Sequence, residues 1–244
     1  MVDGKFVKVR GYEKKIPVVY GIDYLTHDIP HYLLSVSENY HTFKSFFTSL
    51  RLANYPLQGI VSDDNINIPE ACLSVYPNTI CQLCQSHYKE NLRRALGLYA
   101  DLTYLPFMKE VECLFSKRMS NDEFLGFGSK IYERYKNYHL CTQALFDIQR
   151  RLPNLLVYTK LPNLPRTNNL IESFNSHLEG RLKTIKGFES FESADSWLNA
   201  YFLRRRLKKF TDCERKFRCL NGKRSLELTL KTCYRIEDVL SLKK

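Results

Sequence analysis

Residues 166–188, RTNNLIESFNSHLEGRLKTIKGF, contain the feature that decides the fold we predict for this chain. Their apolar residues recur at three- and four-residue spacing, the pattern of an amphipathic helix that buries one face. Glu172 nevertheless lies between Ile171 and Phe174, in largely apolar surroundings. A carboxylate in such a place is costly unless a metal ion or another cation compensates it. The stretch therefore predicts a helix that carries a functional acid.

Composition limits the class of protein. The 244 residues, 44% of them hydrophobic, can form one large core or a core with a subdomain. There is no apolar run of eighteen residues, and MVDGKFVKVR lacks the apolar stretch of a signal peptide. We therefore expect a soluble intracellular protein with no membrane partner, cytoplasmic and nucleoid-associated in a prokaryote or nuclear in a eukaryote. In that setting the eight cysteines are expected to be reduced, with Cys213, Cys219 and Cys233 in the core.

The charge favours a polyanionic partner. The net charge is +11, and Lys and Arg side chains gain affinity for nucleic acids by releasing counterions from phosphates. Residues 181–218 contain eleven Lys or Arg against five Asp or Glu, with aromatic residues between them. Such a run is often only a solvated helix face, but it can also follow a DNA backbone. The candidate DNA contacts are Arg181, Lys183, Arg204, Arg205 and Arg206.

The periodicity predicts an order of β-β-β-α-β-α-β-α in the first part of the chain. The expected strands cover residues 2–11, 17–25, 29–39, 57–62 and 78–84, and the expected helices cover 41–52, 68–75 and a segment from His87. Residues 88–160 have helical spacing throughout, with a helix cap expected at residues 120–123. Pro153, Pro162 and Pro165 are expected to frame an extended connector. A last helix is predicted at residues 190–210.

This order contains the ingredients of an RNase H-like fold. We predict an α/β architecture in which a mixed β-sheet is flanked by helices, with a helical insertion between the second Asp and the Glu. Residues 1–87 would form the first part of the core and residues 88–160 the insertion. Residues 161–244 would complete the core with the helix of Glu172 and the basic C-terminal helices.

An RNase H-like fold places one acid in the first strand, one at the end of the fourth strand and one on a helix beside them. The candidates are Asp3, Asp63 and Glu172. We choose Asp63 over Asp64 because it comes first after the apolar run 60–61. Two Mg²⁺ ions about 3.5 to 4 Å apart would compensate the three carboxylates and serve phosphodiester chemistry. Mn²⁺ can replace Mg²⁺ in this scheme.

Three segments of the chain resemble the catalytic domain of Mutator-like DDE transposases, a group that includes several families of bacterial insertion sequences. They are VDGKFVKVRG, IVSDDNINIPEACLSVYPNTICQLCQSHYKENL and TNNLIESFNSHLEGRLKTIKGF. The resemblance implies a DNA transposase in which the same three acids are catalytic metal ligands. It also implies cleavage and strand transfer on double-stranded DNA, at element ends and in target DNA, by a homo-oligomer.

Within the second segment, Cys84-x-x-His87 is similar to the Cys-x-x-His signature of that family. We therefore expect Cys84 and His87 beside the active site, with His87 able to contact the scissile phosphate. The alternative is a zinc site that includes Cys81, although a structural zinc ion needs a fourth ligand. Asn169, like its neighbours Asn168 and Asn175, is expected either to contact DNA or to cap and hydrogen-bond the helix.

A second interpretation belongs to another class of protein. Members of the resembled family usually carry a DNA-binding region ahead of the first Asp, and this sequence begins two residues before Asp3. The alternative is therefore an inactive or truncated transposase remnant that acts only as a DNA-binding protein. Cleavage activity separates the two interpretations.

Overall fold

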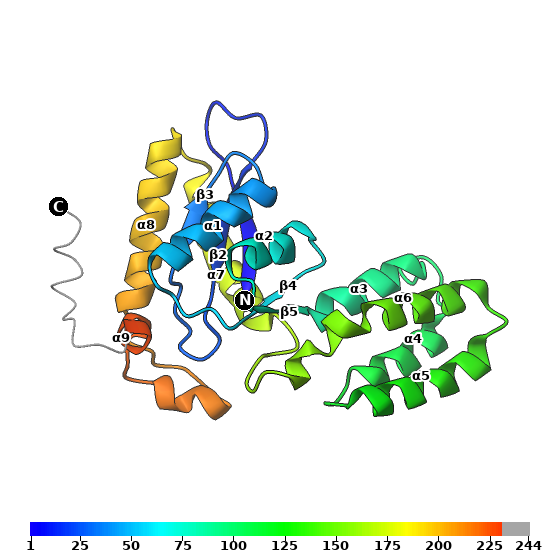
Figure 1. Ribbon diagram of the computed structural model, residues 1–244. Helices are drawn as coiled ribbons and strands as arrows, with labels where there is room; N and C mark the ends of the chain where they lie inside the picture. The colour runs from blue at the N-terminus through cyan, green and yellow to red at the C-terminus, as the bar shows by residue number, and fades with distance from the viewer. Residues whose placement is uncertain (231–244) are drawn as a thin grey trace. The chain divides into compact units, whose positions relative to one another are not determined.

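The computed structural model describes residues 1–230 and has the predicted order of elements (Figure 1). The strands are β1 (Val2–Val7), β2 (Ile16–Gly21), β3 (Tyr32–Leu34), β4 (Gly59–Ser62) and β5 (Ile80–Leu83). The α-helices are α1 (Tyr40–Leu52), α2 (Asn67–Val75), α3 (Gln85–Ala95), α4 (Leu105–Leu114), α5 (Asn121–Tyr135), α6 (His139–Leu155), α7 (Asn169–Ile185), α8 (Phe191–Leu207) and α9 (Ser225–Leu230). Two short 3-10 helices are η1 (Val157–Thr159) and η2 (Arg215–Leu220).

These elements form two compact units. The first unit combines Met1–Pro56, Glu70–Pro77 and the chain from Asn169 onward, and the second combines Leu57–Pro69 with Asn78–Asn168. The described strands form two separate sheets, one antiparallel and one parallel. The mixed α/β content is thus confirmed, whereas the RNase H-like arrangement and the boundaries of the insertion stay predictions.

The first unit is built on the antiparallel sheet β1-β2-β3. Because side chains alternate along a strand, Val18 and Tyr20 of β2 share one face, and both belong to the core that α7 and α8 complete. Gly21 faces the other side, where a β-carbon would lie 3.3 Å from the ring of Phe46 on α1. Glycine at this position lets α1 pack closely on the sheet. The sheet therefore lies between α1 and the pair α7 and α8.

Helices α7 and α8 form because their apolar residues recur on one face. The buried residues of α7 include Ile171, Phe174 and Leu178, and those of α8 are Ala194, Leu198 and Phe202. Helix α8 begins at a capping box in which the side chain and backbone of Ser190 exchange hydrogen bonds with Ser193. The buried residues of both helices pack on the sheet face that carries Tyr20.

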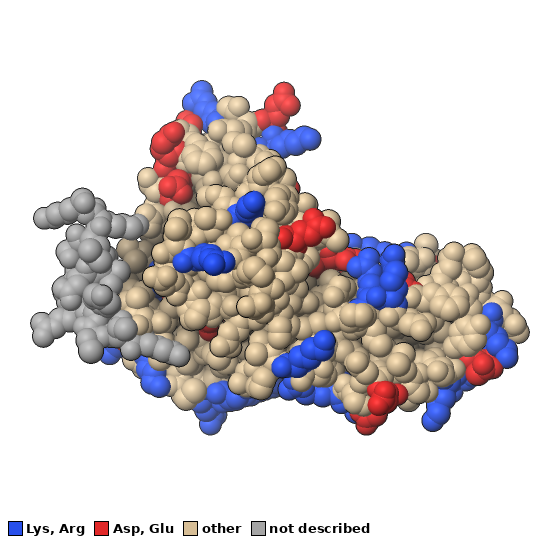
Figure 2. All heavy atoms as spheres, viewed as in Figure 1, with Lys and Arg blue, Asp and Glu red and all other residues tan. Residues whose placement is uncertain are grey.

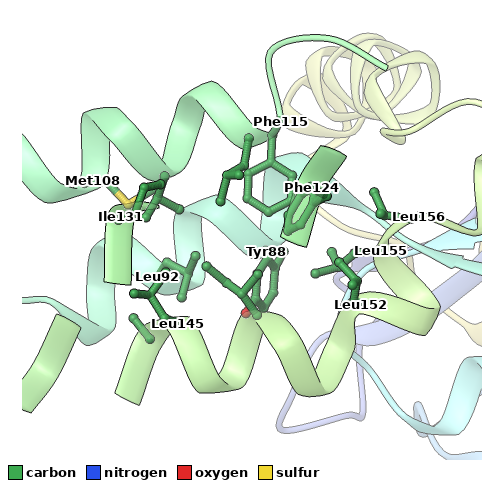
Figure 3. Close-up of a cluster of buried hydrophobic side chains, with 14 of the residues drawn as sticks. Tyr88, Leu92, Met108, Phe115, Phe124, Ile131, Leu145, Leu152, Leu155 and Leu156 are labelled. Carbon is green, nitrogen blue, oxygen red and sulfur yellow. The ribbon is translucent and has the colours of Figure 1, made fainter. Parts of the chain in front are cut away.

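The second unit joins the parallel pair β4-β5 to helices α3–α6. Its core is a cluster of buried side chains, in which Tyr88 and Leu92 of α3 lie near Leu145, Leu152 and Leu155 of α6 (Figure 3). The buried amide of Gln82 in β5 donates to the carbonyl of Leu155 at 2.9 Å. This bond ties the end of α6 to the strand that precedes Cys84.

Two details of the second unit test predictions made from the sequence. The cap at residues 120–123 is confirmed, because Ser120 and Glu123 form a capping box at the start of α5. The prediction that Pro153 frames an extended connector is wrong, because Pro153 lies inside α6. Proline removes one backbone hydrogen bond of this last turn, and the buried side chains of Leu152 and Leu155 hold the turn in place by packing.

The cysteine prediction also needs correction. Cys213 is only partly buried and Cys219 is exposed, so neither is a core residue. Both follow α8 in a segment with few apolar residues, which leaves little core for them to join. Cys233 lies outside the described residues. Within residues 1–230, no helix is both long enough and apolar enough to cross a membrane.

Candidate active site

Asp3, the first predicted acid, lies in β1 and is half-buried. One carboxylate oxygen accepts the backbone N–H of Gly4 at 2.8 Å, and the other accepts the Nδ2 of Asn175 at 2.6 Å. In the strand register Asp3 stands opposite Tyr20, so both side chains belong to the sheet face that α7 covers. The carboxylate is therefore held in a defined orientation toward α7.

Asn175 connects Asp3 to the core of the unit. This residue of α7 is 3% exposed, and its Oδ1 accepts a hydrogen bond from the hydroxyl of Tyr20. Burial raises the pKa of Tyr20 far above its ordinary value, and the charges of Asp3, Tyr201 and Glu172 raise it further. The hydroxyl therefore stays protonated and keeps donating to Asn175.

Glu172 lies in the first turn of α7, three residues before Asn175 and thus on the same helix face. It is half-buried between Ile171 and Phe174, both buried. Its charge acts on the Tyr20 hydroxyl together with that of Asp3. Two of the three predicted acids therefore lie in the same compact unit as Tyr20, and their charges act on its hydroxyl.

The roles of Tyr20 and Asn175 were not foreseen from the sequence. For Asn175 the sequence left DNA contact and helix capping open, and the structure uses its amide as a buried link between two side chains. The three-residue spacing from Glu172 was the available signal. The sequence held no such signal for Tyr20, because a tyrosine in a strand is usually a packing residue.

Asp63 follows β4 in the second unit and is half-buried. Its Oδ1 accepts the backbone N–H of Asn65 at 3.2 Å, which shapes the turn between β4 and α2. The neighbouring Asp64 forms a salt bridge with Arg151 of α6, and Arg151 also pairs with Asp147 at 3.2 Å. Asp63 therefore stabilises a turn in this unit, whereas Asp64 forms a salt bridge.

Cys84 and His87 lie together at the start of α3. Burial raises the pKa of the Cys84 thiol, but hydrogen bonds from His87 and Asn168 and the charge of His87 outweigh this effect and lower it. The thiol donates to the Oδ1 of Asn168 at 3.0 Å, and the backbone N–H of Asn168 lies 3.4 Å from the sulfur. Cys84 thereby anchors the residue that precedes α7, whose first residue is the exposed Asn169.

The candidate metal ligands do not form a ready-made centre. Among residues 1–230, no three or more His, Cys, Asp or Glu side chains are arranged to hold a metal ion. The zinc alternative for Cys81, Cys84 and His87 thus has no support in this part of the chain. Asp3 and Glu172 belong to one unit and Asp63 to the other, so the shared three-carboxylate centre stays a prediction.

The predicted basic contacts fall into two groups. Arg181, Arg204 and Arg205 line a groove of about 700 Å³ between α7 and α8, which we call the α7–α8 groove. Arg206 instead forms a two-pronged salt bridge with the fully buried Asp28. Lys183 is exposed and pairs with Glu179 one turn away at 3.4 Å. The face in Figure 2 shows Lys and Arg dispersed among other residues, with no continuous basic patch.

Comparison with known families decides what kind of protein carries this site. The family model described as Transposase, Mutator family, matches residues 1–206, a span that includes Asp3, Asp63 and Glu172. The chain belongs to the Mutator family of transposases. No curated protein sequence matches the chain.

Membership in the Mutator transposase family has three consequences. It gives the chain a role in DNA transposition, and a transposase binds DNA. The family is typically catalytic. It also implies a divalent metal ion, for which carboxylates such as Asp3 and Glu172 are suitable oxygen ligands.

Proposed function

We propose that this Mutator-family chain is a DDE transposase catalytic domain. Its reaction would be Mg²⁺-dependent cleavage of a DNA strand followed by strand transfer, with Asp3, Asp63 and Glu172 as the catalytic acids. Hydrolysis breaks a phosphodiester bond at the element end and leaves a free 3′-hydroxyl. The oxygen of that hydroxyl then attacks a phosphorus atom of target DNA, forms a new ester and displaces a target 3′-oxygen.

One observation carries this proposal: α7, the helix that carries Glu172, reaches Asp3 of β1 through the 2.6 Å hydrogen bond from Asn175, three residues after Glu172. Asp3 and Glu172 are far apart in sequence, and both are partly withdrawn from water. Two carboxylates that share one metal site repel each other when the site is empty, and a divalent cation offsets that repulsion. Their position favours a metal-binding role over that of two ordinary surface acids.

The carboxylate oxygens of these acids are suitable ligands for a divalent metal ion. Carboxylate oxygens are the ligands that Mg²⁺ and Mn²⁺ prefer, and a divalent metal, when bound, would stabilise charge on the attacking and leaving oxygens. Asn175 holds one oxygen of Asp3 through its amide, and Gly4 holds the other through its backbone N–H. These two bonds orient the carboxylate before substrate arrives, which is what preorganisation requires.

Asp63 is the second acid in this proposal. The salt bridge to Arg151 engages the carboxylate of Asp64, which supports the choice of Asp63. Asp63 also follows the buried strand β4 directly, and a strand end holds a side chain in place more firmly than a loop does. The Cys84–His87 pair, on the next element after β5, would position this region or contact the scissile phosphate.

DNA would be held mainly through its phosphates, by Arg181 and Arg204 among others. Both line the α7–α8 groove, and neither forms a salt bridge with the acids of residues 1–230. We expect the active form to be a homo-oligomer assembled on DNA. The partner DNA would include both element ends and target sites.

The test is strand cleavage with matched variants. Duplexes carrying the inverted repeats that flank the coding sequence are incubated with the protein and Mg²⁺, Mn²⁺ or EDTA. Glu172→Gln should abolish nicking, whereas Glu179→Gln, an exposed change two turns later on the same helix, should retain it. Metal-dependent nicking that survives Glu172→Gln excludes this residue as a ligand. Binding without any nicking by the wild type favours the remnant interpretation.

A further inference from the structure

The α7–α8 groove has a composition that phosphate binding alone does not explain. Its lining contains five Lys or Arg and one acid, Asp212, and it also contains the paired rings of Trp197 and Tyr201 and the buried His27. All of these residues belong to the first compact unit. A ligand that fits this groove would use the cations, the rings and the histidine together.

Arg205 provides a partly buried positive charge. Burial lowers the pKa of its guanidinium, and among residues 1–230 it forms no salt bridge, although its neighbour Arg206 is fully paired with Asp28. The guanidinium lies over the ring of Phe210, 4.7 Å from the centroid. The charges of Asp212 and Asp28 act on Arg205 without forming a salt bridge with it, so this partly buried cation is suited to an anionic group of a ligand.

His27 provides a buried polar atom. The side chain is 8% exposed, and its Nε2 has no hydrogen-bond partner among residues 1–230. The ring packs against Phe217 and Phe210, with centroids 4.4 and 5.9 Å away. Burial first, and then the charge of Arg205, lowers its pKa to about 4, so the imidazole is neutral at pH 7. Leaving a buried polar atom unpaired is costly, and a ligand in the groove would remove that cost.

Trp197 and Tyr201 provide a pair of stacked aromatic rings. They lie one turn apart on α8 with centroids 5.2 Å apart and rings inclined by 11°, and both are only half-buried. The positive charges of Arg181 and Arg205 act on the hydroxyl of Tyr201, so cations stand beside this surface. Aromatic faces next to cations are the common arrangement for binding stacked bases on a single strand.

We propose that the α7–α8 groove binds an unpaired segment of DNA strand, with a base stacked on the Tyr201–Trp197 pair and phosphates on Arg204 and Arg205. His27 lines the groove, and a shift of its ring would bring the buried Nε2 within reach of a polar edge of the base or sugar. The base faces inside an intact duplex are covered by neighbouring pairs, which leaves only its two terminal faces to stack on the rings. The inference deepens the proposed DNA transposase function and rests on it, since cleavage and strand transfer both produce strand ends that can fray.

The experiment uses the intrinsic fluorescence of Trp197, the single tryptophan of the chain. The full chain is titrated with a twelve-nucleotide oligothymidylate, a blunt duplex of the same length, thymidine monophosphate and inorganic phosphate. Stacking on the Tyr201–Trp197 pair should quench the emission and saturate with the single strand. Phosphate should leave the emission nearly unchanged, and the blunt duplex should quench it much less than the single strand does. Equal quenching by duplex and single strand overturns the proposal, as does no quenching by either.

Variants separate stacking from charge. Tyr201→Leu should weaken single-strand affinity about tenfold, within the range for loss of one aromatic stack, and Tyr201→Phe should restore it. Tyr12→Leu removes an exposed tyrosine elsewhere in the same unit and is the matched control. His27→Asn should weaken single-strand binding several-fold, and Asn tolerates the positive φ of 54° at this position. An equal loss of duplex and single-strand affinity in Tyr201→Leu contradicts the proposal.

The two proposals can fail separately. Glu172→Gln removes a predicted catalytic acid outside the aromatic pair, so it should lose nicking and keep the single-strand quenching. If the wild type nicks DNA but the quenching test fails, the groove proposal is wrong and the transposase proposal stands. If the quenching is present but no condition gives nicking, the groove remains a single-strand site and the catalytic proposal is wrong.

Discussion

The Nδ2 of Asn175 donates a 2.6 Å hydrogen bond to the carboxylate of Asp3, across 172 residues of sequence. The Oδ1 of the same amide accepts from the Tyr20 hydroxyl. An amide is suited to this place because it donates on one side and accepts on the other. Asn175 is thus a positioning residue for a predicted catalytic acid.

We predict that Asn175→Leu impairs metal binding as well as stability. The change removes the bonds that Asn175 makes to the buried Tyr20 hydroxyl and to Asp3, which should cost about 1 to 3 kcal/mol in unfolding free energy. Because Asp3 loses its orientation, the affinity for Mn²⁺ measured by calorimetry should also fall. Asn175→Asp should be worse for folding, since it places a carboxylate beside Asp3. Unchanged Mn²⁺ affinity in folded Asn175→Leu would restrict Asn175 to a structural role.

Asp63 and Asp64 form a natural pair for a second prediction. Asp63→Asn should abolish nicking with little loss of stability, because its Oδ1 would still accept the bond from Asn65. Asp64→Asn should retain nicking but lower the melting temperature by a few degrees, because it breaks the half-buried salt bridge to Arg151. Cleavage assays and thermal melts on both variants check this. The opposite pattern would assign the second acid to Asp64.

Arg206 should matter for stability rather than for DNA affinity. Its two bonds to Asp28 are both 2.9 Å, and Ser225 also donates to Asp28 at 2.9 Å, so Asp28 is a buried charge with dedicated partners. Removing one partner of a buried pair typically costs about 3 to 5 kcal/mol. Chemical denaturation should show a loss of this size for Arg206→Gln, and a loss below about 0.5 kcal/mol for the exposed Arg204→Gln. Similar losses in both variants would contradict this division.

The pH dependence of stability should reveal the lowered pKa of His27. Its pKa is lowered to about 4 by burial and by Arg205, against a smaller opposing effect of Asp23, while the ordinary value is 6.5. Between these values the unfolded chain binds the proton more readily, so stability is complete above pH 6.5 and falls as pH decreases toward 4. The contribution is up to about 1.4 kcal/mol per pH unit. His27→Asn should lose less stability than wild type between pH 7 and 5. His177→Asn, at an exposed position, should follow wild type.

The sequence predicted the order of elements well because its signals are local. The β-rich composition of β2, the three- and four-residue spacing in α7 and the Ser120 cap are each signals within one element. Asp3, Asp63 and Glu172 were selected because each stands at a definite point of such an element. The partners of these acids were not predictable, since Tyr20 meets Asn175 only through tertiary packing. For the same reason the sequence did not predict that Arg206 forms a salt bridge and that Arg205, among residues 1–230, does not. The partner, Asp28, lies far away in sequence and shows no periodic signal.

DNA binding by this chain should be mostly electrostatic, and the salt dependence should identify which arginines bind phosphates. Each phosphate that a variant no longer neutralises should reduce the slope of log affinity against log salt by about one unit. Arg204→Gln and Arg181→Gln should each flatten the slope by this amount, equally for element-end and random duplexes, because point charges on a groove read no base sequence. Arg206→Gln should leave the slope unchanged at a temperature where the variant is folded, since Asp28 already occupies its guanidinium. The measurement is fluorescence anisotropy with labelled duplexes at several salt concentrations. A strong, salt-resistant preference of this chain for one element-end sequence would contradict the prediction, because base readout would then lie within these 244 residues.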